Sequence, residues 1–251
     1  MRTISNIEDM SDSILVCICS RAGDGFETKA REIKKQIGDT IGVPVEFEIV
    51  PNNGKFGLTS VYNHALNTHD NRFVVFTHDD VVFNTINWGS KLIELFEKYK
   101  EYGIIGVAGS ASLGNNAIWW QTGESCRGEV VHDYKKEGAM SVMTLSKFSQ
   151  NDNELDEVCC LDGVFFAVDR TRCNERFDDI TFNGFHFYDV SYTFGAFAKK
   201  VCKVGVTKNF RITHKSIGNS NTTEYNNYRL AFIELYRDYL PVTNLISKRD
   251  V

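Results

Sequence analysis

The residues best suited to chemistry follow a short apolar run. His78, Asp79 and Asp80 come directly after Phe-Val-Val-Phe at residues 73–76 and one threonine. Two adjacent carboxylates repel each other, so both stay ionised at low cost only where solvent or a cation compensates their charge. A hard divalent cation that bridges a diphosphate needs few protein ligands. The triplet therefore predicts a cation and diphosphate site, and a solvated turn is the alternative interpretation.

The elements that must position this triplet alternate between strands and helices. Apolar runs at residues 13–19, 73–76 and 104–108 and the segment 45–50 predict strands, and apolar residues at helical spacing lie between them. This alternation predicts right-handed crossovers and a parallel sheet with helices on both faces. Ligands of such sheets bind at the carboxyl ends of the strands. Three polar clusters stand at those ends: Ser20-Arg21, Asn52-Asn53 and His78-Asp79-Asp80.

The second half of the chain is less regular. Residues 113–150 are rich in Gly, Asn and Ser, which predicts an irregular or antiparallel excursion, and the strand pattern resumes at 157–168. A helix is expected at 188–200 and a strand at 201–212. The C-terminal helix, 222–240, carries an aromatic and apolar stripe, which we expect to pack on the parent domain, with a homodimer contact as the second interpretation. The stripe consists of Tyr225, Tyr228, Phe232, Leu235 and Tyr236. One domain over residues 1–251 is expected.

Composition excludes several classes of function. The net charge is −5 and no basic block occurs, so nucleic acid is not an expected partner. The first 13 residues lack the pattern of a signal peptide, and no apolar run is long enough to span a membrane. The seven cysteines form no CxxC pair, so we expect reduced thiols in a cytoplasmic protein rather than a zinc site.

Residues 76–81, Phe-Thr-His-Asp-Asp-Val, resemble the Asp-x-Asp region of the inverting glycosyltransferases of family 2. Residues 53–63 are similar to that family's Gly-rich turn and following helix. The resemblance implies the α/β GT-A fold, a Rossmann-like and mostly parallel central sheet flanked by helices. It also implies a nucleotide-diphosphate sugar as donor, a saccharide or other hydroxyl compound as acceptor, and Mn²⁺ or Mg²⁺ as cofactor.

The same resemblance suggests the donor side of the site. Asp80 is then the metal ligand, and His78 replaces the first acid of the motif. His214, in residues 212–218, stands where a family histidine completes the metal or diphosphate site, although a lone histidine is often structural. The residues expected to line the nucleotide are Ser20, Arg21, Asn52, His78 and Asp79.

Residues 161–168 and 184–191 resemble the family's acceptor side. Asp189 holds the position of the catalytic base, which takes a proton from the acceptor hydroxyl, although an aspartate early in a helix is also good capping chemistry. Asp162 and Gly163 either hold the acceptor or form a turn. Other acceptor candidates are His186 and the pair Trp119-Trp120, whose rings suit either a sugar face or core packing.

Two other functions compete with this interpretation. A nucleotidyltransferase on a similar sheet usually has a Gly-rich, basic loop after its first strand, and residues 20–25, Ser-Arg-Ala-Gly-Asp-Gly, contain a single basic residue. A non-catalytic nucleotide- or sugar-binding protein is favoured by the departure from Asp-x-Asp at His78. The resemblance covers residues 13–220, with the middle excursion poorly matched, so the inverting transferase is the preferred prediction.

Overall fold

The computed structural model describes residues 11–136, 139–216, 218, 220–243 and 245. Most of the N-terminal segment on which the signal-peptide prediction rests therefore lies outside the described residues. The same is true of the two ends of the predicted 1–251 domain. Among the described residues, no helix is both long enough and apolar enough to cross a membrane.

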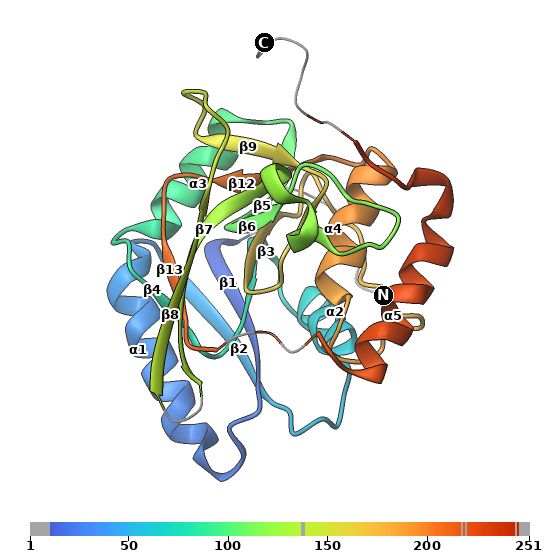
Figure 1. Ribbon diagram of the computed structural model, residues 1–251. Coiled ribbons are helices and arrows are strands. Elements are labelled where there is room, and N and C mark those ends of the chain that lie inside the picture. The colour runs from blue at the N-terminus through green and yellow to red at the C-terminus, as the bar shows by residue number, and fades with distance from the viewer. Residues whose placement is uncertain (1–10, 137–138, 217, 219, 244, 246–251) are drawn as a thin grey trace.

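A seven-stranded mixed sheet forms the centre of the molecule (Figure 1). Its order is β2 (Val45–Pro51), β1 (Ser11–Ser20), β3 (Asn71–Thr77), β11 (Phe165–Asp169), β5 (Tyr102–Gly106), β12 (Lys203–Thr207) and β9 (Leu155–Val158). β11 runs antiparallel to both β3 and β5, and β9 runs antiparallel to β12. The other five strands share one direction, so their carboxyl ends point to the same side of the sheet.

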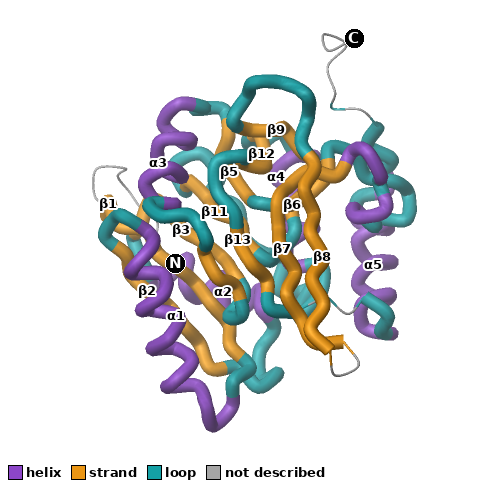
Figure 2. The backbone as a smooth tube through the Cα atoms, turned by 60° about the vertical axis from the view of Figure 1, so that its left-hand side comes forward, coloured by secondary structure: helices purple, strands orange, loops and turns teal. Residues whose placement is uncertain are grey.

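A second sheet contains two strands, β7 (Cys126–Lys136) and β8 (Ala139–Lys147), from the segment 113–150 that was predicted to be irregular or antiparallel. Its order is β10 (Cys160–Leu161), β6 (Ala108–Ser110), β7, β13 (Ile212–His214) and β4 (Val81–Phe83), and β8 pairs with β7. The β7–β8 hairpin projects along one side of the molecule (Figure 2). The predicted strand 201–212 is divided, because β12 joins the central sheet whereas β13 joins the second one.

Helices cover both faces of the central sheet. On one face, α1 (Phe26–Ile41) and α3 (Trp88–Lys98) pack on Ile14, Val16 and Ile18 of β1. On the other face, α2 (Leu58–Thr68) and α4 (Tyr188–Ala198) pack on Leu15 and Cys17. Successive side chains of a strand point to opposite faces, so the continuous apolar run of β1 is buried on both.

The C-terminal helix α5 (Thr223–Leu235) begins at a capping residue, because the Thr222 side chain accepts a hydrogen bond from the Tyr225 amide. Phe232 is fully buried, with its ring centroid 5.3 Å from that of Phe194 on α4. The Tyr236 hydroxyl donates to the Ser191 carbonyl at 3.2 Å. The predicted packing on the parent domain is confirmed for these residues. Leu235 is half exposed and does not take part.

Short 3-10 helices complete the described elements, at Gly23–Gly25, Trp119–Gln121, Gly123–Ser125 and Arg237–Tyr239. All seven cysteines are free thiols, and five of them are buried. Burial raises the pKa of the Cys17 thiol well above its usual value, which keeps this group protonated and unreactive.

Candidate functional site

The three predicted polar clusters meet at the carboxyl ends of β1, β2 and β3. The Ser20 hydroxyl at the end of β1 donates to the Asp79 carboxylate at 2.5 Å. A cavity of about 760 Å³ opens at these strand ends, which is an ordinary size for a small-molecule site. The predicted site residues that line this cavity are Arg21, Asn52, His78, Asp79, Asp80 and His214.

A His–Asp–His cluster lies in this cavity. One ligand atom from each of His78, Asp80 and His214 lies within 4.8 Å of the other two. His214 Nε2 is 3.2 Å from Asp80 Oδ1 and 3.2 Å from His78 Nδ1. β13 brings His214 to the end of β3 by pairing with β4, with His214 opposite Val81. Two imidazoles and one carboxylate at this spacing form a donor set that can hold a divalent cation.

Hydrogen bonding fixes the orientation of the His78 ring. Tyr188 on α4 donates its hydroxyl proton to the Gly163 carbonyl at 3.1 Å, and its oxygen lies 3.0 Å from His78 Nε2. Because that proton is already used, His78 Nε2 carries the hydrogen of the second bond. His78 Nδ1 is then left with a lone pair directed at the cluster. Burial and the facing His214 both lower the pKa of His78, which favours this neutral form.

His132 supports the other imidazole from the neighbouring strand. It stands opposite His214 in the parallel pairing of β7 with β13, and the two Nδ1 atoms are 3.3 Å apart. A hydrogen bond at the second nitrogen of a ligating histidine orients the ring and sets its tautomer. The sequence analysis missed this residue because it lies in the excursion of residues 113–150, where only the tryptophan pair was assigned to a site.

The electrostatics keep Asp80 ionised. Burial alone would raise the pKa of Asp80, but the hydrogen bond and the charge of His214 hold this pKa well below its usual value. Asp80 therefore carries a negative charge throughout the neutral range. A carboxylate held in this state beside two imidazoles is suited to a cation.

Asp189 occupies the first turn of α4, close to the turn that follows β10. Its carboxylate accepts a hydrogen bond from the Gly163 amide at 2.7 Å. Burial, followed by the charge of Asp162, raises the pKa of Asp189 to about 7. A carboxyl group with this pKa can accept and release a proton at neutral pH.

The turn of Asp162 and Gly163 positions Asp189. Asp162 Oδ1 accepts from the Val164 amide at 2.8 Å, which is the turn geometry considered from the sequence. A Cβ atom on Gly163 would lie 2.0 Å from the Tyr188 hydroxyl and 3.0 Å from Asp189 Oδ2. Only glycine therefore fits between Tyr188 and Asp189.

A family model described as a glycosyltransferase-like family matches residues 16–236. The chain belongs to this glycosyltransferase-like family. The family resemblance drawn from the motifs and the predicted GT-A fold class are thereby confirmed. A comparison with curated proteins found no match to the chain.

Solved structures similar to this glycosyltransferase-like protein include GalNAc-T7 with UDP, GalNAc and Mn²⁺, at 9% identity and a TM-score of 0.58. That match covers 90% of this chain and 49% of the other, so the protein spans about half the length of GalNAc-T7. At this identity the likeness shows the fold alone. A mannosyltransferase from Pyrobaculum calidifontis in complex with GDP-Man and Mn²⁺ also matches, at 9% identity and a TM-score of 0.47, covering 84% of this chain and 61% of the other.

Asn52, expected to line the nucleotide, lies at the cavity but directs its side-chain hydrogen bonds elsewhere. Its side-chain amide donates to the Cys19 thiol and the Phe56 carbonyl, and its oxygen accepts from the amides of Lys55 and Phe56. These four contacts use both donors and both lone pairs of the amide group. Asn52 therefore stabilises the loop of residues 52–56 and has no hydrogen-bonding group left for a nucleobase.

Aromatic side chains gather beside Asp189. Trp119 is buried in the core, whereas Trp120 is 43% exposed and its ring centroid lies 6.0 Å from that of Tyr225. The ring of His186 is 5.4 Å from Tyr225 on the other side. Tyr225 has a buried hydroxyl without a hydrogen-bond partner among the described residues. Trp120, Tyr225 and His186 thus lie in ring contact, whereas Trp119, whose ring centroid is 5.9 Å from that of Trp120, is buried in the core.

Phe185 is a further residue that the sequence analysis did not assign. The Arg21 guanidinium lies 4.2 Å from the Phe185 ring centroid, in cation–π geometry, and both residues line the cavity. The segment 184–191 was singled out for Asp189 and His186 on the acceptor side, so Phe185 was not assigned to the donor side.

Proposed function

We propose that the protein transfers a sugar from a nucleotide-diphosphate donor to a hydroxyl acceptor, with inversion at the anomeric carbon and with a divalent cation. The observation that carries this proposal is the His78–Asp80–His214 cluster in the 760 Å³ cavity. Hydrogen bonds through Tyr188 and Gly163 connect His78 of this cluster to Asp189. Membership of the glycosyltransferase-like family supports it.

The donor set favours Mn²⁺ over Mg²⁺ among the two cations considered. Mg²⁺ prefers oxygen ligands and keeps several waters, whereas Mn²⁺ accepts imidazole nitrogen more readily. His78, Asp80 and His214 would hold the ion, and His78 moves from the nucleotide side, where the sequence placed it, to the metal side. When bound, the cation supplies neutralising charge for the departing diphosphate.

The remaining cavity walls suit the nucleotide. Arg21 contributes a positive charge and, with Phe185, a flat surface on which a base can stack. Phe56, 59% exposed, lies in the same lining. Asp79 is oriented by Ser20, so its carboxylate is positioned to accept a hydrogen bond from a hydroxyl of the donor. We assign donor binding to Ser20, Arg21, Asp79 and Phe185 on this basis.

Asp189 acts as the general base in this mechanism. The acceptor oxygen forms a bond to the anomeric carbon, the bond from that carbon to the diphosphate breaks, and the hydroxyl proton passes to the Asp189 carboxylate. Its pKa of about 7 matches this task. The Gly163 amide holds the Asp189 carboxylate in place, and burial, followed by the charge of Asp162, keeps the pKa of Asp189 high. The exposed ring of Trp120, with His186 and Tyr225, offers a surface for the acceptor.

Calorimetry with UDP and GDP, each with and without Mn²⁺, followed by a turnover assay over a panel of nucleotide sugars, tests this function. We expect nucleotide binding that requires Mn²⁺, and slow release of the nucleoside diphosphate by transfer to water. Asp238→Asn, at an exposed aspartate of the 3-10 helix Arg237–Tyr239, is the matched control for Asp80→Asn. Metal-dependent binding without turnover of any donor would favour the non-catalytic binding protein instead.

A further inference from the structure

A second cavity, of about 630 Å³, lies along β9, the last strand of the central sheet. Its lining includes residues 155–157 of β9, the first residues of β5 and β12, and the loop that precedes β9. It has no lining residue in common with the 760 Å³ donor cavity. None of the site residues expected from the sequence lies in it.

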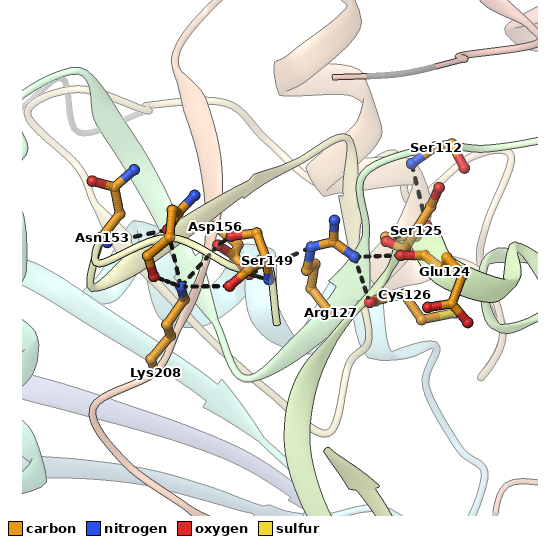
Figure 3. Close-up of polar contacts among 11 residues, drawn as sticks. Ser112, Glu124, Ser125, Cys126, Arg127, Ser149, Asn153, Asp156 and Lys208 are labelled. Atoms are coloured by element: carbon orange, nitrogen blue, oxygen red, sulfur yellow. Dashed lines mark hydrogen bonds and ion pairs between the residues drawn. The ribbon is translucent and has the colours of Figure 1, made fainter. Parts of the chain in front are cut away.

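Arg127 of β7 lines this cavity with an incompletely used guanidinium. The side chain is only 7% exposed. Nη1 donates to the carbonyls of Glu124 and Cys126, at 2.6 and 2.9 Å, and Nε lies 3.4 Å from Asp156 Oδ2. Figure 3 shows these contacts of Arg127, and no hydrogen bond from Nη2 is found within the described part of the chain. Nη2 is not among the fully buried polar atoms that lack a partner, so it faces solvent in the cavity and its two N–H groups are available to a ligand oxygen.

Asp156 holds the guanidinium in place. This carboxylate is 2% exposed and faces two cations, Arg127 and Lys208, the second at 3.4 Å. It also accepts from the Ser149 amide at 2.7 Å and from the Ser149 hydroxyl. Lys208 in turn donates to the carbonyls of Ser149 and Asn151. The open N–H groups of Arg127 are therefore fixed in direction before any ligand arrives, which lowers the entropy cost of binding.

The rest of the lining points to a neutral, hydroxyl-rich ligand. Three carboxylates, Glu101, Glu124 and Glu157, would repel an anion, although Glu157 is paired with Lys203 and Glu124 with Lys147. Side-chain amides occur in the same walls at positions 150, 151 and 153. Sugar hydroxyls can donate to carboxylates and accept from arginine and amide N–H groups. The aromatic members of the lining are Tyr99, Tyr102 and Phe148. Tyr102 is buried and a lysine lies over each ring, so a sugar ring would stack on the face of Phe148 that Lys208 leaves open.

We propose that this cavity is a second carbohydrate site, which binds a neutral saccharide through Arg127 and Phe148 independently of the donor cavity. The proposal concerns binding alone and does not depend on the proposed glycosyl transfer. If saccharide binding at this cavity fails its test, the proposed glycosyl transfer is still judged by its own experiment, and the reverse also holds.

The test uses maltotriose, cellotriose, mannotriose and chitotriose as probes, with binding followed by saturation-transfer NMR and calorimetry on the full chain saturated with UDP and Mn²⁺. We expect at least one trisaccharide to bind under these conditions. Arg127→Lys and Phe148→Ala should each weaken that binding by about tenfold or more, because a charge-assisted hydrogen bond or a stacking surface is lost.

Arg211→Lys is the matched control, because Arg211 is 54% exposed, pairs with Glu129 and does not line the cavity. It should bind as the unchanged protein does, and thermal melting identifies a variant that has lost its fold. Absence of binding for all four probes would overturn the proposal. So would unchanged affinity in folded Arg127→Lys and Phe148→Ala variants.

Discussion

Replacing Asp189 by Asn should abolish transfer and leave the donor site intact. The Asn side-chain oxygen can still accept the hydrogen bond that the Gly163 amide donates to Asp189 at 2.7 Å, so the turn keeps its geometry. The amide cannot take the proton of an acceptor hydroxyl, and loss of a general base costs about 10²–10⁴-fold in rate. Mn²⁺-dependent UDP binding, which rests on other residues, should stay within about twofold of the unchanged protein.

The same substitution has a predictable effect on stability. The pKa of Asp189 rises from 3.8 to about 7, a difference of about 3 units, so the folded state disfavours the ionised carboxylate by at most about 4 kcal/mol. Because the pKa of Asp189 is higher in the folded state than in the unfolded state, Asp189 causes no loss of stability below about pH 4. The free energy of unfolding then falls as the pH rises from about 4 to 7. Asp189→Asn lacks this loss, so it should be the more stable protein at pH 8.

Three measurements test this reasoning together: kcat/KM against pH, calorimetry with UDP and Mn²⁺, and urea unfolding at pH 4.5 and pH 8. We expect kcat/KM of the unchanged protein to rise with pH through about 7. Near-normal turnover by Asp189→Asn would remove this residue from the mechanism and direct the search to Asp162, Asp178 and Asp179. A stability difference that does not grow between the two pH values would refute the assigned pKa.

Four further substitutions test separate parts of the structure. Asp80→Asn removes the only carboxylate of the His–Asp–His cluster, so calorimetry should show Mn²⁺-dependent UDP affinity reduced by about 10–100-fold or more; unchanged affinity would exclude Asp80 as a ligand. His132→Phe should weaken Mn²⁺ binding by about 10–100-fold in an electron paramagnetic resonance titration, and an unaltered titration would contradict its supporting role. Asn52→Ala should lower the free energy of unfolding by about 2–4 kcal/mol, because four hydrogen bonds of the loop 52–56 are lost, whereas a change of less than about 0.5 kcal/mol would show that the loop does not need them. Phe232→Ala should cost about 3–5 kcal/mol in urea unfolding if α5 packs on the parent domain, and a small cost with loss of a dimer in light scattering would favour the dimer interpretation.

The local pattern of the sequence was sufficient for the first half of the fold. Apolar runs buried on both faces predicted β1 and β3, the half-buried alternating run of residues 45–50 predicted β2, and the polar residues after each strand predicted the meeting of Ser20 with Asp79. It could not predict the antiparallel β11, because an apolar run has no direction until its partners are known. The division of residues 201–212 between two sheets has the same cause.

For the site, the sequence indicated which residues come together but not how each is used. Asn52 and His78 both line the cavity as expected, yet the amide of Asn52 is consumed by its own loop and His78 faces His214. These differences depend on hydrogen bonds between residues that are distant along the chain. His132 and Arg127 lie on β7, where pairing with remote strands, rather than any motif, gives a residue its neighbours.

The central claim is inverting transfer of a sugar at the His78–Asp80–His214 site, and one measurement tests it most directly. The protein is incubated with Mn²⁺ and a panel of α-linked nucleotide sugars, and the first free or transferred sugar is followed by proton NMR before its anomers equilibrate. We predict that one donor releases its nucleoside diphosphate and yields the β-anomer, and that Asp189→Asn yields neither. Initial formation of the α-anomer, or no turnover of any donor by a protein that binds UDP and Mn²⁺, would contradict the account.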